Sequence, residues 1–490
     1  MPKKTLIREA TIVSMDPTIG DLAKGDILIV DDRIAQIAST ISADDAEIVD
    51  AEGMIASPGF VDTHRHVWQT QLKGAAINWS LFDYACLMRS MYSVCYSPDD
   101  AYLGNYVGAL DAINAGITSM VDHGHLQISP DHSDQLVQGL KDSGIRGIMC
   151  YGIYRNPKYQ PGDALTSEKI VADIAGPLDD FHRQNAARVR EKHFPSNDGL
   201  MQFGIATSEW VNFTDMAPIL MEMQWARTLE PSRISIHISY GVNEGFRIIP
   251  QLLEHGELGD DLLFVHGNNL TLGELSMLRQ NGGWLSITPE SELQMGMGYP
   301  VLERVVESGS VPSLGIDIAS NYAGDMFAQM RLMLQTMRFR DFEVANAGLP
   351  TTERYAARKM LEFATIGGAI CMGMEDITGS LTPGKKADII LTRMDSVNMS
   401  PVRDPIAALV FYADAADIDS VWVDGVARKR GGLLTGLDWD AVRGRLIRSR
   451  DHIYEEFAKI DEVAVRNAWA PLWGISKSAA EPAVKVEIHS

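Results

Sequence analysis

Between about residue 58 and residue 316, short apolar runs alternate with longer segments in which apolar residues recur every three or four positions. The first pattern is typical of buried parallel strands and the second of amphipathic helices. The apolar runs are Gly59–Asp62, Ile117–Asp122, Ile145–Tyr151, Gln202–Thr207, Ile234–Ile238, Leu262–Val265, Trp284–Thr288 and Val311–Ile316. The helical patterns between them are Asp99–Ala115, Asp134–Ser143, Lys169–Glu191, Thr214–Thr228, Ile248–His255, Leu272–Gln280 and Val301–Ser308. Eight alternations predict an α/β fold, a (β/α)8 TIM-type barrel.

The segments on either side of the barrel have a different pattern. Residues 5–57 alternate apolar and polar positions between turns, which is typical of short antiparallel strands. After a helical stretch at Thr352–Met372, the segments GSLTPGKKADIILTRMD and VWVDGVARKRGG again predict strands. We expect the two sets of strands to form one small discontinuous β-sandwich domain. The predicted units are 1–57 (β-domain, first part), 58–375 (barrel), 376–435 (β-domain, second part) and 436–490 (C-terminal helical tail).

Composition and charge narrow the class of protein. The 490 residues are 46% hydrophobic and 22% charged, as in globular proteins, and 65 acidic residues against 43 basic ones give a net charge of −22. Phosphate binding needs a basic face, so nucleic acid is not expected as a partner. No run of about 18 apolar residues predicts a membrane span, and the first residues lack the pattern of a signal peptide. Four cysteines without a C-x-x-C pair indicate reduced thiols and a cytoplasmic protein.

Candidate metal ligands follow several of the predicted strands. The stretch PGFVDTHRH ends in His64 and His66, and residues two apart on a strand point to the same side. His237 lies in RISIHIS, His266 in LLFVHGN and Asp317 in VPSLGIDIAS. In a parallel barrel, side chains at the strand ends meet at one face, and imidazoles with a carboxylate can bind a divalent ion such as zinc. A single histidine of this kind is usually structural, but five such residues together predict a metal site.

Longer motifs then indicate a family. PGFVDTHRH, GITSMVDHG, LGIDIASNYAGDMFAQMRL and GSLTPGKKADIIL resemble the first-strand, second-strand, eighth-strand and return motifs of the amidohydrolase superfamily. The resemblance covers nearly the whole chain and is to the branch with cytosine and guanine deaminases and the triazine hydrolases. It implies a small-molecule substrate and a homo-oligomer, a dimer or larger.

The resemblance also assigns roles by position. It implies that His64, His66, His237 and Asp317 bind one divalent metal, zinc with iron as the alternative. Asp317 would also take a proton from the attacking water, and His266 would hydrogen-bond that water or the substrate. The fourth strand, MQFGIATSEW, lacks the lysine that holds a second metal in other branches, so a mononuclear site is expected.

One position departs from the family pattern. Three residues after the fifth-strand histidine, the branch has a glutamate that carries protons to the leaving group, whereas this chain has Tyr240. A tyrosine has a pKa near 10 and exchanges protons poorly at neutral pH. Three alternatives follow. Tyr240 is the acid or orients the substrate; Glu244 or Glu209 supplies the missing carboxylate; or the reaction needs no such group.

Aromatic and thioether side chains predict the substrate pocket. The family places substrate contacts in the loop after the first strand, here HVWQTQLKGAAINWSLFDY, and in the loop after the seventh, here TPESELQMGMGYP. The candidate contacts are Trp68, Gln71, Trp79, Phe82, Tyr84, Glu290 and Met295. These residue types favour a flat, largely apolar ligand. His123 and His125 would line the mouth, His125 at the surface or behind the metal ligands.

The predicted function is therefore a metal-dependent hydrolase acting on a cyclic or heteroaromatic nitrogen compound by deamination, dechlorination or amide C–N cleavage. The first alternative is a lyase or decarboxylase on the same fold, for which the missing glutamate would be no defect. The second is a non-enzymatic scaffold, which has no reason to keep all five candidate residues.

Overall fold

The computed structural model describes residues 2–157, 163, 166–174, 178–209, 215–238, 247–344 and 352–475. Within these residues, eight parallel strands form one sheet in sequence order, each paired with the next. They are β6 (Phe60–Arg65), β7 (Ile117–Gly124), β8 (Arg146–Gly152), β9 (Met201–Ala206), β10 (Ile234–Ile238), β11 (Leu262–His266), β12 (Trp284–Ile287) and β13 (Pro312–Leu314). All eight predicted strands are confirmed to within a few residues.

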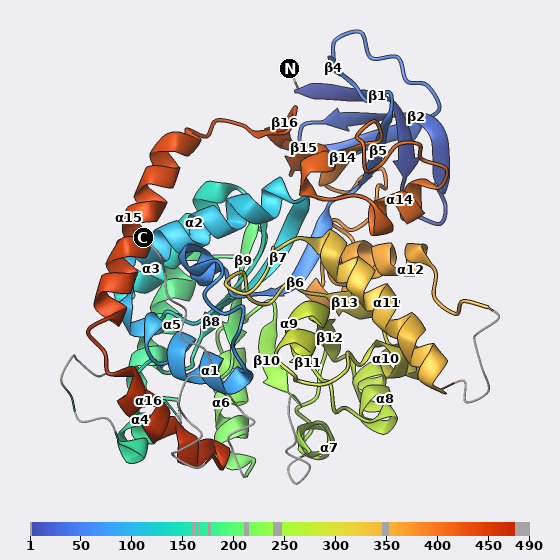
Figure 1. Ribbon diagram of the computed structural model, residues 1–490. Helices are drawn as coiled ribbons and strands as arrows, with labels where there is room; N and C mark the ends of the chain where they lie inside the picture. Colours follow the sequence, from blue (N-terminus) through green and yellow to red (C-terminus); the bar gives the residue numbers. More distant parts are fainter. Residues whose placement is uncertain are drawn as a thin grey trace.

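The sheet is nearly closed by contacts between its first and last strands. The backbone N–H of Asp317, just after β13, donates to the carbonyl of His64 at 2.8 Å. The N–H of His66 donates in return to the carbonyl of Asp317 at 2.7 Å. Helices surround the strands (Figure 1), as a TIM-type barrel requires.

Helices connect the barrel strands. They are α2 (Pro98–Asn114), α3 (Pro130–Ser143), α4 (Ser167–Ile174), α5 (Asp180–His193), α6 (Ala217–Arg227), α7 (Ile248–Glu254), α8 (Leu272–Asn281), α9 (Pro289–Gln294) and α10 (Leu302–Ser308). After the last strand come α11 (Met326–Val344), α12 (Ala357–Glu362) and α13 (Gly368–Met372). The helical patterns given above do not include α9 or α11. The single helix predicted over Lys169–Glu191 is wrong, because this stretch contains α4 and α5. A proline stands at position 177 between them, and proline removes a hydrogen bond from a helix interior.

A second, mixed sheet combines strands that precede the barrel in the sequence with strands that follow it. Its described strands are β1 (Lys4–Val13), β2 (Asp21–Val30), β3 (Arg33–Ala38), β4 (Glu47–Asp50), β5 (Met54–Pro58), β14 (Ile389–Arg393), β15 (Ile418–Val423), β16 (Val426–Arg430) and β17 (Leu433–Leu434). β5 and β14 pair antiparallel, which joins the early and late strands. The sheet has an apolar core of its own, including Ile7, Ile27, Ile389 and Trp422. The discontinuous β-domain is therefore confirmed, whereas its boundaries at 57 and 376 stay predictions.

A buried ion pair joins the barrel to this second sheet. Nε of Arg146, at the start of β8, lies 2.7 Å from Oδ2 of Asp388, and its Nη2 lies 2.7 Å from Oδ1 of Asp424. The side chains of Arg146 and Asp388 are 5% and 0% exposed. A buried cation of this kind needs its carboxylate partners, because water does not compensate its charge.

The C-terminal tail forms the predicted helices, α15 (Trp439–Phe457) and α16 (Glu462–Trp469), along the outside of the barrel (Figure 1). Nη1 of Arg466 donates to Asp83, the last residue of α1 (Leu81–Asp83). The indole N–H of Trp469 donates to Oγ of Ser90 at 2.8 Å. These contacts dock α16 onto the loop that follows the first barrel strand.

Candidate metal centre

His64 and His66 lie at the end of β6, where the barrel closes. The backbone of Asp317 pairs with the backbone at the end of this strand. This pairing places the side chains of His64, His66 and Asp317 at the same edge of the sheet. Asp317 and His266 both have positive φ angles, 70° and 72°, which are uncommon for residues with a Cβ atom. Backbone strain of this kind concentrates at functional sites, where it directs a side chain.

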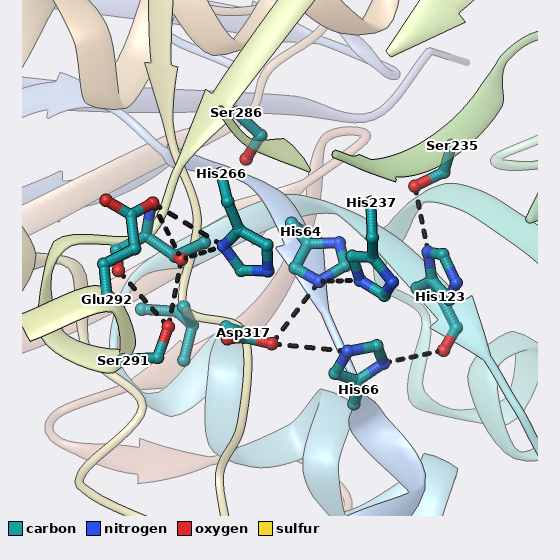
Figure 2. Close-up of polar contacts among 12 residues, drawn as sticks. His64, His66, His123, Ser235, His237, His266, Ser286, Ser291, Glu292 and Asp317 are labelled. Atoms are coloured by element: carbon teal, nitrogen blue, oxygen red, sulfur yellow. Dashed lines mark hydrogen bonds and ion pairs between the residues drawn. The ribbon is translucent and has the colours of Figure 1, made fainter. Parts of the chain in front are cut away.

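Four side-chain atoms converge in front of β6 (Figure 2). Oδ1 of Asp317 lies 3.4 Å from Nε2 of His64 and 3.3 Å from Nε2 of His66. Nε2 of His237 lies 3.2 Å from Nε2 of His64. Ligands at about 2.0–2.1 Å around a tetrahedral zinc ion are roughly 3.4 Å apart, so these spacings fit the edges of such a polyhedron.

The electrostatics of this cluster suit a cation. Burial lowers the pKa of His64 well below its ordinary value and also lowers that of His237. Burial opposes the ionisation of Asp317, but the neighbouring His64 and His66 hold its pKa well below the usual range. Neutral imidazoles and an ionised carboxylate are the protonation states that a divalent metal requires.

Neighbouring groups orient two of the imidazoles. Nδ1 of His66 lies 3.0 Å from the carbonyl of His123, so it donates there. Nδ1 of His237 lies 3.3 Å from Oε1 of Glu209 and donates to this carboxylate. In both rings the lone pair is therefore on Nε2, which faces the centre. Partners of this kind fix the tautomer of metal-binding histidines.

His266 is positioned by a buried acidic group. Its Nδ1 lies 3.0 Å from Oγ1 of Thr288 and 3.6 Å from Oε1 of Glu292. Glu292 is fully buried and accepts hydrogen bonds from the N–H of Thr288 and from Nδ2 of Asn268. Burial alone would lower the pKa of His266, but the carboxylates of Glu292 and Asp317 raise it overall.

His123 and His125 add a second set of imidazoles beside the first. Both are 1% exposed, which excludes the surface position for His125 and leaves the other expected position, behind the metal ligands. The ring of His125 stacks on that of His66, with centroids 4.3 Å apart. Ligand atoms of His123, His125 and His237 lie within 4.8 Å of one another. Because Nδ1 of His237 donates to Glu209, only one lone pair of this ring is available, which favours a single metal.

A cavity opens beside the four converging atoms. Its described lining residues are His66, Leu81, Tyr84, Ala85, Arg89, His125, Tyr154, Glu209, His237, His266, Met295, Met297, Asp317, Ile318 and Trp469. Tyr84 and Met295 are therefore predicted contacts that the structure brings to the site. The described lining does not include Trp68, Gln71, Trp79, Phe82 or Glu290.

These five predicted contacts pack elsewhere. Trp68 packs on Tyr96, Trp79 on Tyr92, and Phe82 on Trp473. Gln71 donates to the carbonyl of Asp100 and to Oγ of Ser449. Glu290 accepts from Nε2 of Gln329, and burial raises its pKa to about 7. The 3₁₀ helix Val67–Leu72 has all its side chains buried, which explains why Trp68 and Gln71 point into the protein.

Sequence reasoning missed several residues of the cavity wall, three of them with polar or aromatic side chains. Arg89, Tyr154 and Trp469 come from segments far apart in the chain. For Arg89 a signal existed, since it is the one charged residue in the apolar run YACLMRSMYSVC. Tyr240 and Glu244, considered above as proton carriers, lie outside the described residues.

Comparison with known proteins agrees with this geometry. The model of the amidohydrolase family matches residues 55–428. The chain belongs to the amidohydrolase family. This amidohydrolase is 27% identical to a 5-methylthioadenosine/S-adenosylhomocysteine deaminase of Desulforudis audaxviator, over 92% of the chain and 99% of the relative. It is also 27% identical to a 5'-deoxyadenosine deaminase of Methanothermobacter thermautotrophicus, over 86% and 92%.

Solved structures share the fold of this amidohydrolase. A zinc-bound adenosine deaminase from Xanthomonas campestris superposes with a TM-score of 0.77 at 20% identity, over 92% of this chain and 99% of that one. Atrazine chlorohydrolase from Arthrobacter aurescens TC1, complexed with zinc, gives 0.77 at 20% identity, over 91% and 100%.

The family assignment confirms the predicted class. The protein is an amidohydrolase-type hydrolase that depends on a divalent metal. The lyase alternative is not favoured by these relatives. In the described part of the chain, no helix is both long and apolar enough to cross a membrane.

Proposed function

We propose that this amidohydrolase removes an amino group from a heteroaromatic nitrogen compound by hydrolysis. The observation that carries the proposal is the convergence of Nε2 of His64, His66 and His237 with Oδ1 of Asp317 at the edge of a cavity. The named deaminases among its relatives favour a C–N bond over a C–Cl bond. Dechlorination and amide cleavage remain the alternatives.

The four residues His64, His66, His237 and Asp317 would hold one zinc or iron ion. Such an ion, when bound, lowers the pKa of a coordinated water to about 7 and so supplies the nucleophile at neutral pH. Asp317, being ionised, would accept the proton of that water. His266, held by Thr288 and Glu292, would donate a hydrogen bond to the ring atom next to the attacked carbon. Tyr84 and the methionines would hold a flat ring.

Two measurements test the reaction: the release of ammonia and the incorporation of oxygen-18 from water into the product. The metal-loaded protein is incubated with aminopyrimidines, aminotriazines and aminopurines in water enriched in oxygen-18, and released ammonia is measured. We expect ammonia together with one labelled oxygen in the product. Product without the label would point to the lyase alternative, and chloride release from chlorinated rings would point to dechlorination.

Metal content tests the ligand set. We expect about one zinc or iron per chain in protein purified without added metal, and a loss of most of it in the His64→Ala variant, because three remaining ligands bind far less tightly. Elemental analysis measures both. His132→Ala is the matched control, since His132 is also buried but hydrogen-bonds Ser129 and Tyr96 instead. Two ions per chain would contradict the mononuclear assignment.

Glu209 is the carboxylate that we propose for the missing proton carrier. It lines the cavity and follows the last residue of β9 by three positions. A glutamine at this position could still accept the hydrogen bond from His237. We expect Glu209→Gln to lower kcat by about 100-fold or more with metal content unchanged. Tyr240→Phe, in parallel, should change kcat less than about tenfold. The reverse pattern would return the role to Tyr240, as the sequence position suggests.

A further inference from the structure

Arg89 is a buried cation that has no counter-ion among the described residues. Its side chain lies in the wall of the cavity and is 4% exposed. Its Nη1 and Nη2 have no hydrogen-bond partner among the residues that the structure describes, and none of the ion pairs found there includes Arg89. Its Cζ lies 3.7 Å from the ring centroid of Tyr154, so one face of the guanidinium is covered by the aromatic ring.

A second buried arginine shows what is missing. Arg146 has the same exposed fraction, 4%, yet it contacts the carboxylates of Asp388 and Asp424. Buried charges in proteins are usually paired, because an unpaired buried charge strongly destabilises the folded state. An unpaired arginine in the wall of a ligand cavity is therefore available to form an ion pair with an anionic group of the ligand.

Another donor stands close to Arg89. Neither ring nitrogen of His125 has a hydrogen-bond partner in the described structure, and an imidazole always carries at least one N–H. The ring centroid of His125 lies 5.9 Å from that of Tyr154, the ring on which Arg89 rests. The guanidinium and the imidazole thus offer at least three unsatisfied N–H groups on the same wall of the cavity.

We propose that Arg89, with His125, binds a carboxylate carried by the substrate. This inference rests on the proposed function, whose substrate class it narrows to a heteroaromatic amine bearing a carboxylate. The planar pair of guanidinium N–H groups matches the two oxygens of a carboxylate. A phosphate carries close to two negative charges, and Arg89 is the one lysine or arginine in the described lining. One positive charge therefore favours a group with one negative charge.

The test is binding, which does not depend on turnover. Matched pairs of carboxylate and carboxamide on aminopyridine, aminopyrimidine and aminotriazine rings are titrated calorimetrically into the zinc-loaded protein. In at least one ring series we expect the carboxylate to bind about 10- to 100-fold more tightly than the carboxamide, as for a hydrogen-bonded charge pair. In Arg89→Met the preference should vanish, and Arg89→Lys should restore part of it.

Three results would overturn the proposal: no carboxylate preference in any series, a preference that survives in Arg89→Met, or tighter binding of the matching phosphonates. Ammonia release is followed in the same samples, so a carboxylate preference without any release would reject the proposed reaction and keep the anion site.

Thermal unfolding separates ligand binding from a structural role. Because Arg89 has no counter-ion among the described residues, Arg89→Met should leave the thermal midpoint unchanged or raise it. Arg146→Met, the equally buried but paired control, should lower it. A clear fall in the midpoint of Arg89→Met, comparable to that of Arg146→Met, would show that Arg89 stabilises the fold and would count against the proposal.

Discussion

The Asp317→Asn variant is expected to lose about 10²–10⁴-fold in kcat while keeping much of its metal. Asparagine has the same shape as aspartate, so the amide oxygen can remain near Nε2 of His64 and His66, where Oδ1 lies now. It cannot accept a proton from water, however, and removing a positioned general base costs about 10²–10⁴-fold in rate. Turnover and elemental metal content should be measured on the same preparation.

Asp325→Asn is the matched control for this experiment. Asp325 lies in the same segment, and its carboxylate caps α11 by accepting from the N–H of Ala328, a bond that asparagine can also accept. We expect this variant to retain nearly full activity. Near-normal turnover of Asp317→Asn would reject the role proposed for Asp317, whatever the metal content.

Replacing Arg146 by methionine should lower the free energy of unfolding by about 3–5 kcal/mol, the cost of removing one partner of a buried ion pair. The change leaves Asp388 fully buried without the cation that it contacts at 2.7 Å. It also removes the contact to Asp424, which secures the turn between β15 and β16. Denaturant titration followed by tryptophan fluorescence measures the loss, and Trp422 lies in the core of the affected sheet.

The ion pair between Lys4 and Asp45 provides the comparison. Its atoms lie 2.8 Å apart, but the side chains are 29% and 63% exposed. Lys4→Met should therefore cost less than about 1 kcal/mol. If Arg146→Met cost no more than Lys4→Met, the buried pair would not be what joins the barrel to the second sheet.

The barrel could be predicted because its strands are buried on both faces. Such strands are continuous apolar runs, and Ile234–Ile238 has the same bounds in sequence and structure. The residues at their ends, His64, His237 and Asp317, then come together because parallel strands share one edge. For these positions, the local sequence pattern predicts the strand ends, and the fold brings those ends together at one site.

The cavity wall could not be predicted in this way. Which loop side chains face a ligand depends on how segments far apart in the chain dock. Gln71 turns toward Ser449 of α15, and Trp469 of α16 reaches the cavity because Arg466 contacts Asp83. The spacing of apolar residues does not predict such contacts. An arginine within an apolar run, such as Arg89, is unusual and therefore indicates a candidate functional residue.

The antiparallel pairing of β5 with β14 sets an order of events during synthesis. Pro58 leaves the ribosome about 330 residues before Ile389, its partner in that ladder. At typical translation rates of about 5–20 residues per second, the early strands wait roughly 17–66 seconds, and α16 with Trp469 follows later still. Throughout this interval the edge of β5 lacks its partner strand β14. The second sheet can therefore be completed only late in synthesis, after β14–β17 have left the ribosome.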